Sequence, residues 1–286
     1  MSLLRNTKKI LIQNNIRPKK GLGQHFLVDN HVLNQIITAA ELSKDDVVLE
    51  IGAGMGILTT QLVPLTAKVV AIEIDPVLIN ILRSELAGYE NVILIKDDIL
   101  KVNLSELFKA EGKVKVIANL PYYIVTPVIF HLLQAKENFS TLILMVQKEV
   151  GDRIVAKPGS KIYGTLSVSV QYHTKAELIC HVRSECFSPQ PKVDSVVLRL
   201  DVLEAPAISV KDEQFFFKVV KGAFSKRRKM LINAISDLGI SKDTLADVIS
   251  EAKIDLKRRG ETLSLEEFGK LSDLLLSQRD ARDNED

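Results

Sequence analysis

Short apolar runs rich in valine, isoleucine and leucine alternate with amphipathic segments between residues 46 and 201. Polar or turn residues bound each run, which is typical of strands buried on both faces of a sheet. The alternation predicts a parallel α/β sheet with helices on both faces. The predicted strands are Val47–Ile51, Lys68–Ile74, Val92–Ile95, Val114–Ala118, Thr141–Val146, Ser167–Tyr172 and Ser195–Leu200. The predicted crossover helices include Ile57–Leu65, Pro76–Ala87, Pro127–Gln134 and Lys148–Ala156. The last two runs have no helix between them and are expected to form an antiparallel pair at one edge.

The pattern changes after the loop Glu204–Ala207, beyond which no strong strand is predicted. Apolar residues then recur at helical spacing, over residues 212–223, 226–238, 244–253 and 265–277. Ser264 and Glu267 fit a capping box before the last of these helices, and Gly239 fits a helix C-terminus. We therefore expect an α/β domain over residues 1–204, with a basic segment at 1–27, and a small all-α domain over residues 205–286.

Charge is distributed unevenly along the 286 residues, although the formal net charge is only +2. Met1–Leu27 carries six lysines and arginines and no acid, and Lys218–Leu231 carries six more, again without an acid. The remainder of the chain is therefore acidic. Two basic segments on an acidic body favour a polyanionic partner such as nucleic acid. Solvated charge runs are the plainer alternative.

Composition narrows the class of protein further. The chain is 46% hydrophobic and 26% charged, which is ordinary for a globular protein. Its two cysteines, Cys180 and Cys186, do not have the spacing of zinc ligands, so no metal site is expected. No run approaches the roughly 20 apolar residues of a membrane span, and the first apolar run is too short for a signal peptide. We expect a soluble, cytoplasmic protein that makes no membrane contact.

A glycine-rich turn follows the first predicted strand and precedes a predicted helix. Gly52, Gly54 and Gly56 alternate with other residues, and Glu50 lies two positions before the first glycine. Ligands of open α/β sheets bind beyond the carboxyl ends of strands, and glycine lets a ligand approach the backbone closely. A dinucleotide fingerprint would place its last glycine at Ile57. An acid such as Glu50 would repel a pyrophosphate, but it can orient the loop or accept from an ammonium group. The pattern therefore favours a zwitterionic ligand with a cationic centre.

Acidic residues end the next two predicted strands. Glu73 ends the second strand, where a carboxylate can accept hydrogen bonds from both ribose hydroxyls. Asp98 follows the third strand, where a carboxylate can accept from an adenine amino group. Each such charge-assisted hydrogen bond is worth about 1.5–3 kcal/mol. Because the acids stand in register at successive strand ends, the sequence favours an adenosyl ligand.

The fourth predicted strand leads into Asn119-Leu120-Pro121-Tyr122. The N6 amino group of adenine is a poor nucleophile because its lone pair is delocalised into the ring. Two acceptors, the side-chain oxygen of Asn119 and the backbone carbonyl of Leu120, can bind its two N–H bonds and free the lone pair. Pro121 stiffens the turn, and Tyr122 can stack on an extruded base for about 1–3 kcal/mol. Catalysis would then depend on positioning and on polar orientation of the amine.

With these motifs in order, the chain resembles the bacterial-type ribosomal RNA adenine N6,N6-dimethyltransferases of the small subunit. The resemblance extends from about Lys19 to Leu271. It rests on the segments Gly23–Leu27 (GQHFL), Glu50–Gly56 (EIGAGMG), Asn119–Tyr122 (NLPY), Phe187–Ser195 (FSPQPKVDS) and Phe224–Lys229 (FSKRRK). Each segment is moderately specific, and the five in this order are very specific. The resemblance implies a Rossmann-like class I S-adenosylmethionine methyltransferase sheet with a small all-α C-terminal domain.

The resemblance also implies roles for individual residues. It implies that Phe187 stacks on the target base opposite Tyr122, and that Asn119 touches both the cofactor and the target amine. The residues expected to bind S-adenosylmethionine are His25, Leu27, Glu50, Gly52, Gly54, Gly56, Glu73, Asp98 and Asn119. The residues expected to act in catalysis are Asn119, Leu120, Pro121, Tyr122 and Phe187. The residues expected to contact RNA are Lys19 and Lys20, from the charge pattern alone, and Lys226, Arg227, Arg228 and Lys229, from the charge pattern and the resemblance together.

The substrate that the resemblance implies is a pair of adjacent adenosines in a hairpin near the 3′ end of small-subunit ribosomal RNA, each receiving two methyl groups. The expected partner is the small ribosomal subunit, bound by a monomer. The chain departs from the family's usual pattern at Thr165, where arginine is more common, and this departure puts one RNA contact in doubt.

Three other functions stay open at the level of the sequence. The macrolide-resistance adenine methyltransferases of large-subunit ribosomal RNA share the Asn-x-Pro-Tyr chemistry, but the segments Pro191–Ser195 and Phe224–Lys229 favour the small-subunit family. A non-catalytic ribosome assembly factor is disfavoured by the intact Asn119 and Glu73. A methyltransferase acting on protein amides is disfavoured by the basic helical domain, which leaves DNA as a possible substrate.

Overall fold

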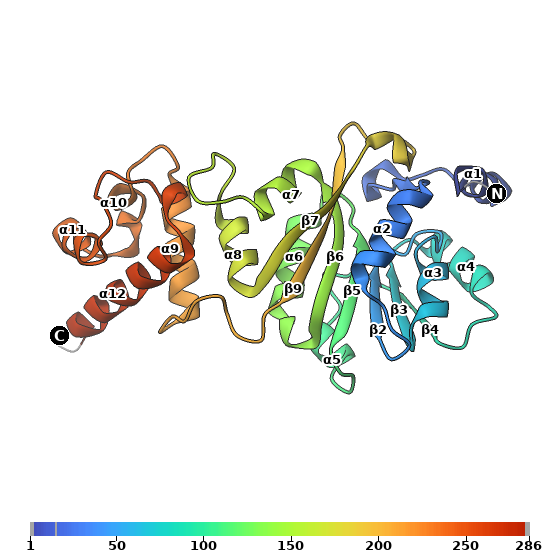
Figure 1. The fold of residues 1–286 in the computed structure, drawn as a ribbon, viewed down its shortest axis with the longest axis horizontal. Helices are drawn as coiled ribbons and strands as arrows, with labels where there is room; N and C mark the ends of the chain where they lie inside the picture. The colour runs from blue at the N-terminus through green and yellow to red at the C-terminus, as the bar shows by residue number, and fades with distance from the viewer. Residues whose placement is uncertain (1–2, 15, 284–286) are drawn as a thin grey trace. The chain divides into compact units, whose positions relative to one another are not determined.

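The computed structural model describes residues 3–14 and 16–283, and it divides into two compact units. The first unit comprises the residues up to Gly151 together with Lys175–Val202. The second comprises Asp152–Thr174 together with the residues from Leu203 onward. Figure 1 shows the sheet of the first unit and the helices of the second. The segment Asp152–Thr174 thus packs with the helical residues, whereas the sequence-based division at residue 204 placed it in the α/β domain.

The order of elements follows the alternation of apolar runs and amphipathic segments in the sequence. The strands are β1 Phe26–Leu27, β2 Val47–Ile51, β3 Lys68–Glu73, β4 Val92–Lys96, β5 Val114–Asn119, β6 Phe139–Gln147, β7 Thr174–Val182, β8 Phe187–Ser188 and β9 Ser195–Val202. The α-helices are α1 Leu3–Gln13, α2 Asn30–Ala40, α3 Thr59–Leu62, α4 Pro76–Glu85, α5 Leu104–Leu107, α6 Val125–Gln134, α7 Lys148–Ile154, α8 Thr165–His173, α9 Glu213–Ser225, α10 Leu231–Ala234, α11 Lys242–Glu251 and α12 Leu265–Asp283.

The main sheet has the strand order β4-β3-β2-β5-β6-β9-β7, and β1 pairs separately with β8. Strands β4, β3, β2, β5 and β6 run parallel to one another, and β9 runs antiparallel to β6. Ile51 is in register with Ile72 of β3 and with Ala118 of β5. The carboxyl ends of the three central strands therefore lie side by side, and the residues that follow each strand meet at one edge of the sheet.

Six of the seven predicted strands are confirmed, and the run Ser167–Tyr172 is wrong because it lies within α8. Seven of the nine residues of α8 are buried, so its sequence shows no polar face from which a helical period could be inferred. The Ser167 hydroxyl accepts a hydrogen bond from the Gly164 backbone N–H, which helps to start the helix. β9 instead lies between β6, with which it pairs antiparallel, and β7, a strand that was not predicted.

One face of the sheet is closed by helices of the first unit. Leu33 and Ile36 of α2, Leu62 of α3 and Leu82 of α4 are at most 3% exposed and belong to one core cluster with the strands. Alternate strand residues face this cluster, including Val48, Val69 and Ile117, each 0% exposed. Burial of both strand faces explains why the strands appear in the sequence as continuous apolar runs.

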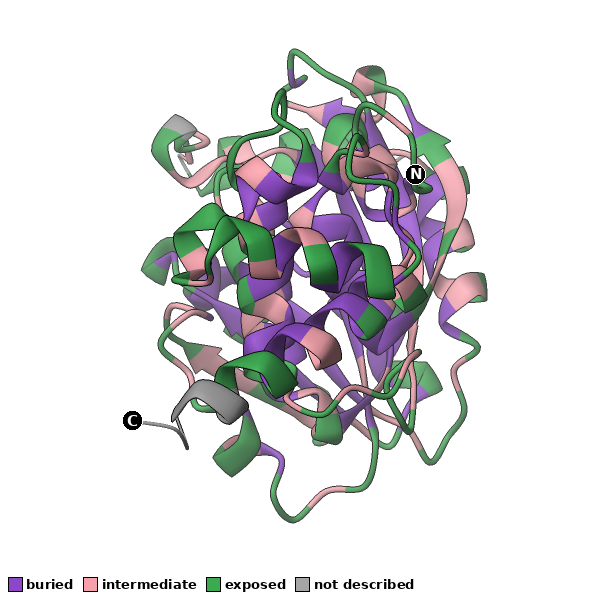
Figure 2. Cartoon of the chain, turned by 90° about the vertical axis from the view of Figure 1, so that its left-hand side faces the viewer, coloured by how far each residue is buried: buried purple, intermediate pink, exposed green. Residues whose placement is uncertain are grey.

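The second unit has its own core, formed by helices α8, α9, α10, α11 and α12. Its centre includes Tyr163, Phe216 and Phe268, each 0% exposed. The predicted capping box of α12 is confirmed, because the Ser264 backbone N–H donates to the Glu267 carboxylate at 2.9 Å and the Glu267 N–H donates to the Ser264 hydroxyl. Figure 2 shows the helices with buried inner faces and exposed outer faces.

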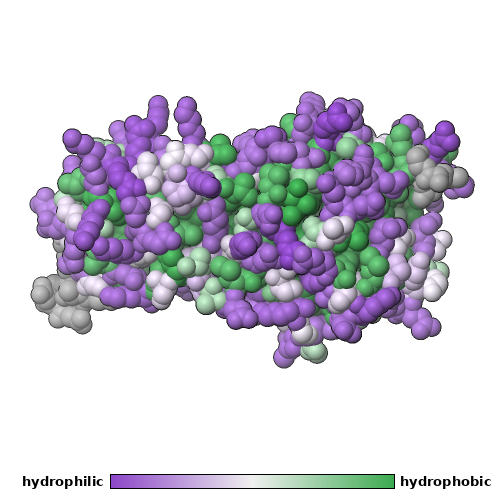
Figure 3. All heavy atoms as spheres, in the orientation of Figure 1, coloured by the Kyte–Doolittle hydropathy of each residue, from purple (hydrophilic) through white to green (hydrophobic). Residues whose placement is uncertain are grey.

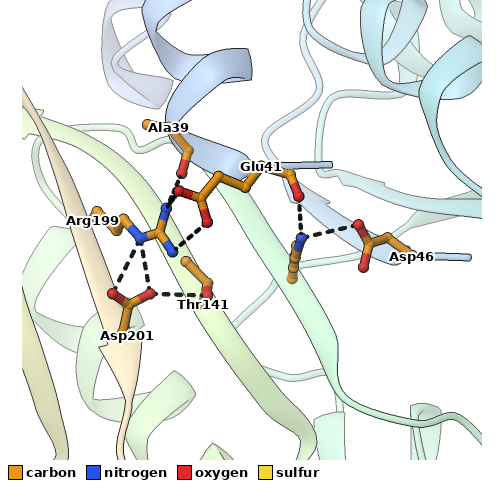
Figure 4. A network of polar contacts seen from close by, with 7 residues as sticks. Ala39, Glu41, Asp46, Thr141, Arg199 and Asp201 are labelled. Atoms are coloured by element: carbon orange, nitrogen blue, oxygen red, sulfur yellow. Dashed lines mark hydrogen bonds and ion pairs between the residues drawn. The ribbon is translucent and has the colours of Figure 1, made fainter. Parts of the chain in front are cut away.

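A polar network fixes the C-terminal end of α2 to the sheet, at the edge where β2 and β5 begin (Figure 4). The Arg199 guanidinium on β9 donates to the Ala39 carbonyl at 2.8 Å and pairs with the carboxylates of Glu41 and Asp201. The Lys115 ammonium joins the Glu41 carbonyl to Asp46, which precedes β2. These contacts lie at the opposite edge from the glycine turn, so they support the scaffold and not the candidate site.

Within the described residues, no helix combines the length and apolar character needed to cross a membrane. The face of the chain seen in Figure 3 is mostly hydrophilic, with hydrophobic side chains in separate patches.

Candidate active site

The glycine turn wraps around the end of β3. Gly52 and Gly54 have φ angles of 72° and 61°, a region that favours glycine. The Gly52 N–H donates to the Ile72 carbonyl at 2.8 Å, and the Gly54 N–H donates to the Glu73 carboxylate at 2.9 Å. A Cβ atom at Gly54 would touch the Phe26 ring at 3.5 Å. The turn is therefore held close to both β3 and residues 19–27, which are called the N-terminal segment.

The Glu73 carboxylate, which is predicted to bind the cofactor ribose, also holds the backbone of the glycine turn in place. It is 6% exposed, and its second carboxylate oxygen accepts from the Asp75 N–H at 2.8 Å. Burial raises the pKa of Glu73, and the hydrogen bonds from the Asp75 and Gly54 backbones oppose that effect. The carboxylate thus fixes the turn through contacts within the protein alone.

A cavity opens at this edge of the sheet. Predicted site residues that line it are His25, Gly52, Gly54, Glu73, Asp98, Asn119, Leu120, Pro121 and Tyr122. These residues come from the ends of β2, β3, β4 and β5 and from the N-terminal segment. One space therefore touches both the acids and the turn Asn119–Tyr122, which is named the catalytic turn after its predicted role. The predicted cofactor residues Leu27, Glu50 and Gly56 do not line this cavity.

Asn119 ends β5 with its amide oriented by the N-terminal segment. Its side-chain nitrogen donates to the His25 backbone carbonyl at 3.2 Å. Because the nitrogen is bound in this way, the side-chain oxygen is the group available as an acceptor. The Leu120 N–H donates to the Met145 carbonyl at 3.1 Å, which anchors the turn to β6.

Tyr122 is held at its ring and at its hydroxyl. The hydroxyl forms a hydrogen bond of 2.8 Å with the buried Ser195 side chain. The ring stacks on His25, with centroids 5.7 Å apart and planes inclined by 23°. The His25 ring also forms a 2.7 Å hydrogen bond from Nδ1 to the Pro189 carbonyl, which requires a proton on Nδ1. One face of Tyr122 is therefore already covered by His25.

Leu27 and Phe187 lie in the core. They are register partners in the β1–β8 pair, and each is 4% exposed. In this arrangement Phe187 is shielded from the cavity, so stacking of its ring on a base would need the side chain to move. Its stacking role stays a prediction.

Glu50 is buried beneath the glycine turn at 1% exposure, and its Oε2 atom has no hydrogen-bond partner among the described residues. Burial raises the pKa of Glu50 to about 8, interactions with Thr59 offset this only in part, and the charge of Glu73 adds to it. The structure does not bring Glu50 to the cavity, where it would meet a ligand's ammonium group.

Tyr123 lines the cavity and was not predicted from the sequence, because the catalytic motif ends at Tyr122. The residue is 56% exposed, and its ring lies against Gly23, where an added Cβ would come within 3.5 Å of it. Burial raises the pKa of Tyr123, and the charges of Asp98 and Glu73 raise it further. Tyr123 therefore shares the cavity with the two acids expected to hold a nucleoside.

The predicted RNA-binding residues differ in how far they are already paired. Lys226 pairs with Asp237 at 2.9 Å, and Arg227 donates to the backbone carbonyls of Lys161 and Tyr163. Arg228 and Lys229 are exposed. Lys19 pairs with Asp75 in the first unit, and the side chain of Lys20 lies outside the described residues. Thr165 begins α8 and is half-buried.

The residues at the cavity fit S-adenosylmethionine. Glycines with positive φ allow a ligand to approach the turn, and two carboxylates at neighbouring strand ends supply acceptors for ribose and adenine. Asn119 and Leu120 lie on the same cavity, where an amine could meet a methyl donor. Fold and site together define a class I S-adenosylmethionine methyltransferase.

Comparison with known proteins identifies the family. A family model described as ribosomal RNA adenine dimethylase matches residues 15–275. A protein named Ribosomal RNA small subunit methyltransferase A from Clostridium acetobutylicum is 51% identical over 268 residues, covering 94% of this chain and 97% of its own length. Its namesake from Clostridium botulinum (strain Loch Maree / Type A3) is 48% identical over 270 residues, covering 94% and 98%. The chain belongs to the ribosomal RNA adenine dimethylase family.

Solved structures agree with this assignment. The crystal structure of a dimethyladenosine transferase from Plasmodium falciparum has a TM-score of 0.77 and 29% identity, covering 90% of this chain and 98% of its own. A 23S ribosomal RNA methyltransferase shares the fold, with a TM-score of 0.69 at 24% identity over 87% of this chain and 99% of its own. The predicted fold class, family, methyltransferase activity and S-adenosylmethionine cofactor are confirmed.

Proposed function

We propose that this chain transfers methyl groups from S-adenosylmethionine to the N6 atoms of two adjacent adenosines near the 3′ end of small-subunit ribosomal RNA, two on each base. The observation that carries the proposal is the Asn119 amide. Its nitrogen donates to the His25 carbonyl, which leaves its oxygen as the free acceptor of a residue that lines the cavity with Glu73 and Asp98. The names of the relatives from both Clostridium species favour the small subunit over the large one.

Different residues of the first unit would hold the methionine, ribose and adenine parts of the cofactor. Gly52 and Gly54 would lie against its methionine part, Glu73 would accept hydrogen bonds from the ribose hydroxyls, and Asp98 would accept a hydrogen bond from the adenine amino group. When bound, the cofactor supplies a methyl group on a sulfonium, which is a good leaving group. No strong general base is required of the protein.

The target adenosine would be held by the catalytic turn. The Asn119 side-chain oxygen and the Leu120 carbonyl accept the two N–H bonds of the amine, which makes the nitrogen lone pair available for attack. Tyr122 stacks on the extruded base with the face that His25 leaves open. The amine proton leaves to solvent after transfer. The monomethylated nitrogen keeps one N–H bond, which donates to one of the two acceptors and is oriented for a second transfer.

The second unit would supply contacts to the RNA backbone. Arg228 and Lys229 are exposed on it, and phosphate contacts of this kind position an RNA without reading its sequence. The proposal places the protein in the cytoplasm as a monomer that acts on the small ribosomal subunit.

The direct test uses small ribosomal subunits that lack this modification, incubated with the protein and labelled S-adenosylmethionine. The ribosomal RNA is then digested, and the modified nucleoside is identified by mass spectrometry. We expect dimethyladenosine at two adjacent positions near the 3′ end. Label in free large-subunit RNA but not in small subunits would move the protein to the resistance-type enzymes. Tight RNA binding with no label in either substrate would favour a non-catalytic assembly factor.

A further inference from the structure

Asp75 is a buried acid just beyond β3, two residues after Glu73. The residue is 2% exposed, and no role in cofactor or RNA binding follows from its place in the motifs. Its carboxylate caps α4 by accepting from the Val77 N–H at 3.0 Å. A helix cap needs only one side-chain acceptor, yet this carboxylate accepts two further hydrogen bonds from a distant part of the chain.

Both further donors come from the N-terminal segment. The Lys19 ammonium donates to Asp75 Oδ1 at 2.9 Å, and the Gln24 side-chain nitrogen donates to Asp75 Oδ2 at 2.8 Å. The Gln24 side-chain oxygen in turn accepts from the Lys19 backbone N–H at 2.7 Å. Lys19 and Gln24 thus close the segment into a compact loop fixed at one carboxylate. Burial would raise the pKa of Asp75, but the hydrogen bonds from Lys19 and Gln24 outweigh that effect and hold the pKa below its usual range.

The loop held in this way forms a wall of the cofactor cavity. Gly23, Gln24 and His25 line the cavity, whereas Asp75 does not. Gly23 has a φ of 58°, and a Cβ atom there would come within 3.4 Å of Pro121. The loop therefore lies directly on the catalytic turn, and its next residue, His25, holds the Asn119 amide. Loss of the Asp75 contacts would free a cavity wall without removing any group that touches the ligand.

We propose that Asp75 is a positioning residue for S-adenosylmethionine, holding the loop from Lys19 to Gln24 closed over the cofactor, and that Lys19 serves cofactor binding and not RNA binding. This inference rests on the proposed function. It differs from the prediction made from the charge pattern, in which Lys19 contacts RNA. Because Lys19 is paired with an almost fully buried carboxylate, the charge of Asp75 offsets that of Lys19 and weakens its attraction to a phosphate.

The test measures S-adenosylmethionine binding to the full chain by calorimetry, without RNA. Asp75→Asn and Lys19→Met are each expected to raise the Kd about tenfold, since the apparent Kd rises as the closed fraction falls. At saturating cofactor, kcat should change less than about threefold, because the bound ligand restores the closed loop. Lys19→Arg keeps the charge and should bind within about threefold of the wild type. The double variant should bind no more weakly than Asp75→Asn alone, because both changes remove one interaction.

Lys109→Met is the matched control, because it removes a lysine from an exposed ion pair with Glu106, whose side chains are 75% and 70% exposed. It should leave the Kd unchanged. Should Asp75→Asn fail to fold, Lys19→Met carries the same prediction. RNA binding by Lys19→Met should keep the wild-type dependence on salt concentration, whereas loss of a true phosphate contact lowers that slope by about 0.7–0.9.

Unchanged cofactor affinity in Lys19→Met together with a lower salt slope would overturn the inference and return Lys19 to the RNA surface. Unchanged affinity in all variants, with normal binding by the wild type, would overturn the inference alone. Absence of cofactor binding by the wild type would overturn the proposed function as well.

Discussion

Replacing Glu50 with glutamine is expected to flatten the pH dependence of stability of the first unit. Glu50 is 1% exposed beneath the glycine turn, and burial raises its pKa to about 8. In the unfolded chain the same carboxyl has its ordinary pKa of 4.5. Between these two values the folded chain retains a proton that the unfolded chain has released.

The sign and size of the effect follow from this difference. Stability falls as pH rises wherever the folded state binds more protons, so the contribution of Glu50 is complete below pH 4.5 and is lost as pH approaches 8. One proton corresponds to about 1.4 kcal/mol for each pH unit. From pH 6.0 to pH 7.5, the free energy of unfolding should therefore fall by about 2 kcal/mol through Glu50. Glutamine has nearly the same shape and does not ionise. The free energy of unfolding of Glu50→Gln should therefore show almost none of this fall between the two pH values.

The measurement is urea unfolding of wild type and Glu50→Gln at both pH values, followed by circular dichroism because the chain has no tryptophan. Hydrogen exchange of the β2 amides reports on the first unit separately from the second. Glu85→Gln makes the same chemical change at an exposed position of α4 and should leave the pH dependence unchanged. An equal change in the free energy of unfolding of wild type and Glu50→Gln between the two pH values would refute the reasoning, because it would show that Glu50 is already ionised when buried.

Three further outcomes test the site and the RNA surface. Asn119→Ala should abolish methyl transfer while calorimetry still detects cofactor binding; full activity would remove Asn119 from the mechanism. Arg228→Met and Lys229→Met should each lower the salt slope of RNA binding by about 0.7–0.9, and an unchanged slope would place the RNA surface elsewhere. Tyr123→Ala should weaken S-adenosylmethionine binding about three- to tenfold in calorimetry, because it removes a ring that lines the cavity, at a cost of about 1 kcal/mol. Tyr123→Phe should bind nearly as the wild type does, and equal loss in both would assign the effect to the hydroxyl.

The sequence was most informative where a feature is local and repeated. Strands β2, β3 and β5 lie inside the sheet with most of their residues buried, so each appears as an apolar run with clear ends. The edge strand β4 is less buried, but its run Val92–Ile95 is also wholly apolar. Parallel pairing then brings the residue after each run to the same edge, which is why the sequence alone suffices to group Gly52, Glu73, Asp98 and Asn119. That grouping follows from topology and needs no knowledge of side-chain contacts.

Features that depend on tertiary contacts could not be predicted in the same way. The α8 helix is buried on nearly all sides, so its β-branched residues resemble those of a strand. The β1–β8 pair contains two residues in each strand, too few to show a period. The burial of Phe187 and the pairing of Lys19 with Asp75 join residues far apart in the chain, and charge or motif alone did not reveal either.

The N-terminal segment contacts both Asp75, beside the cofactor cavity, and Asn119, in the catalytic turn. At one end, Lys19 and Gln24 bind the carboxylate of Asp75, whose backbone N–H also fixes Glu73. At the other end, the His25 carbonyl holds the Asn119 amide. The short stretch from Lys19 to His25 therefore lines the cavity and also binds the Asn119 side-chain nitrogen. A change that opens this segment should disturb cofactor binding first and the orientation of Asn119 second, since the cofactor cavity is walled by the loop itself, whereas Asn119 is also fixed by its place at the end of β5.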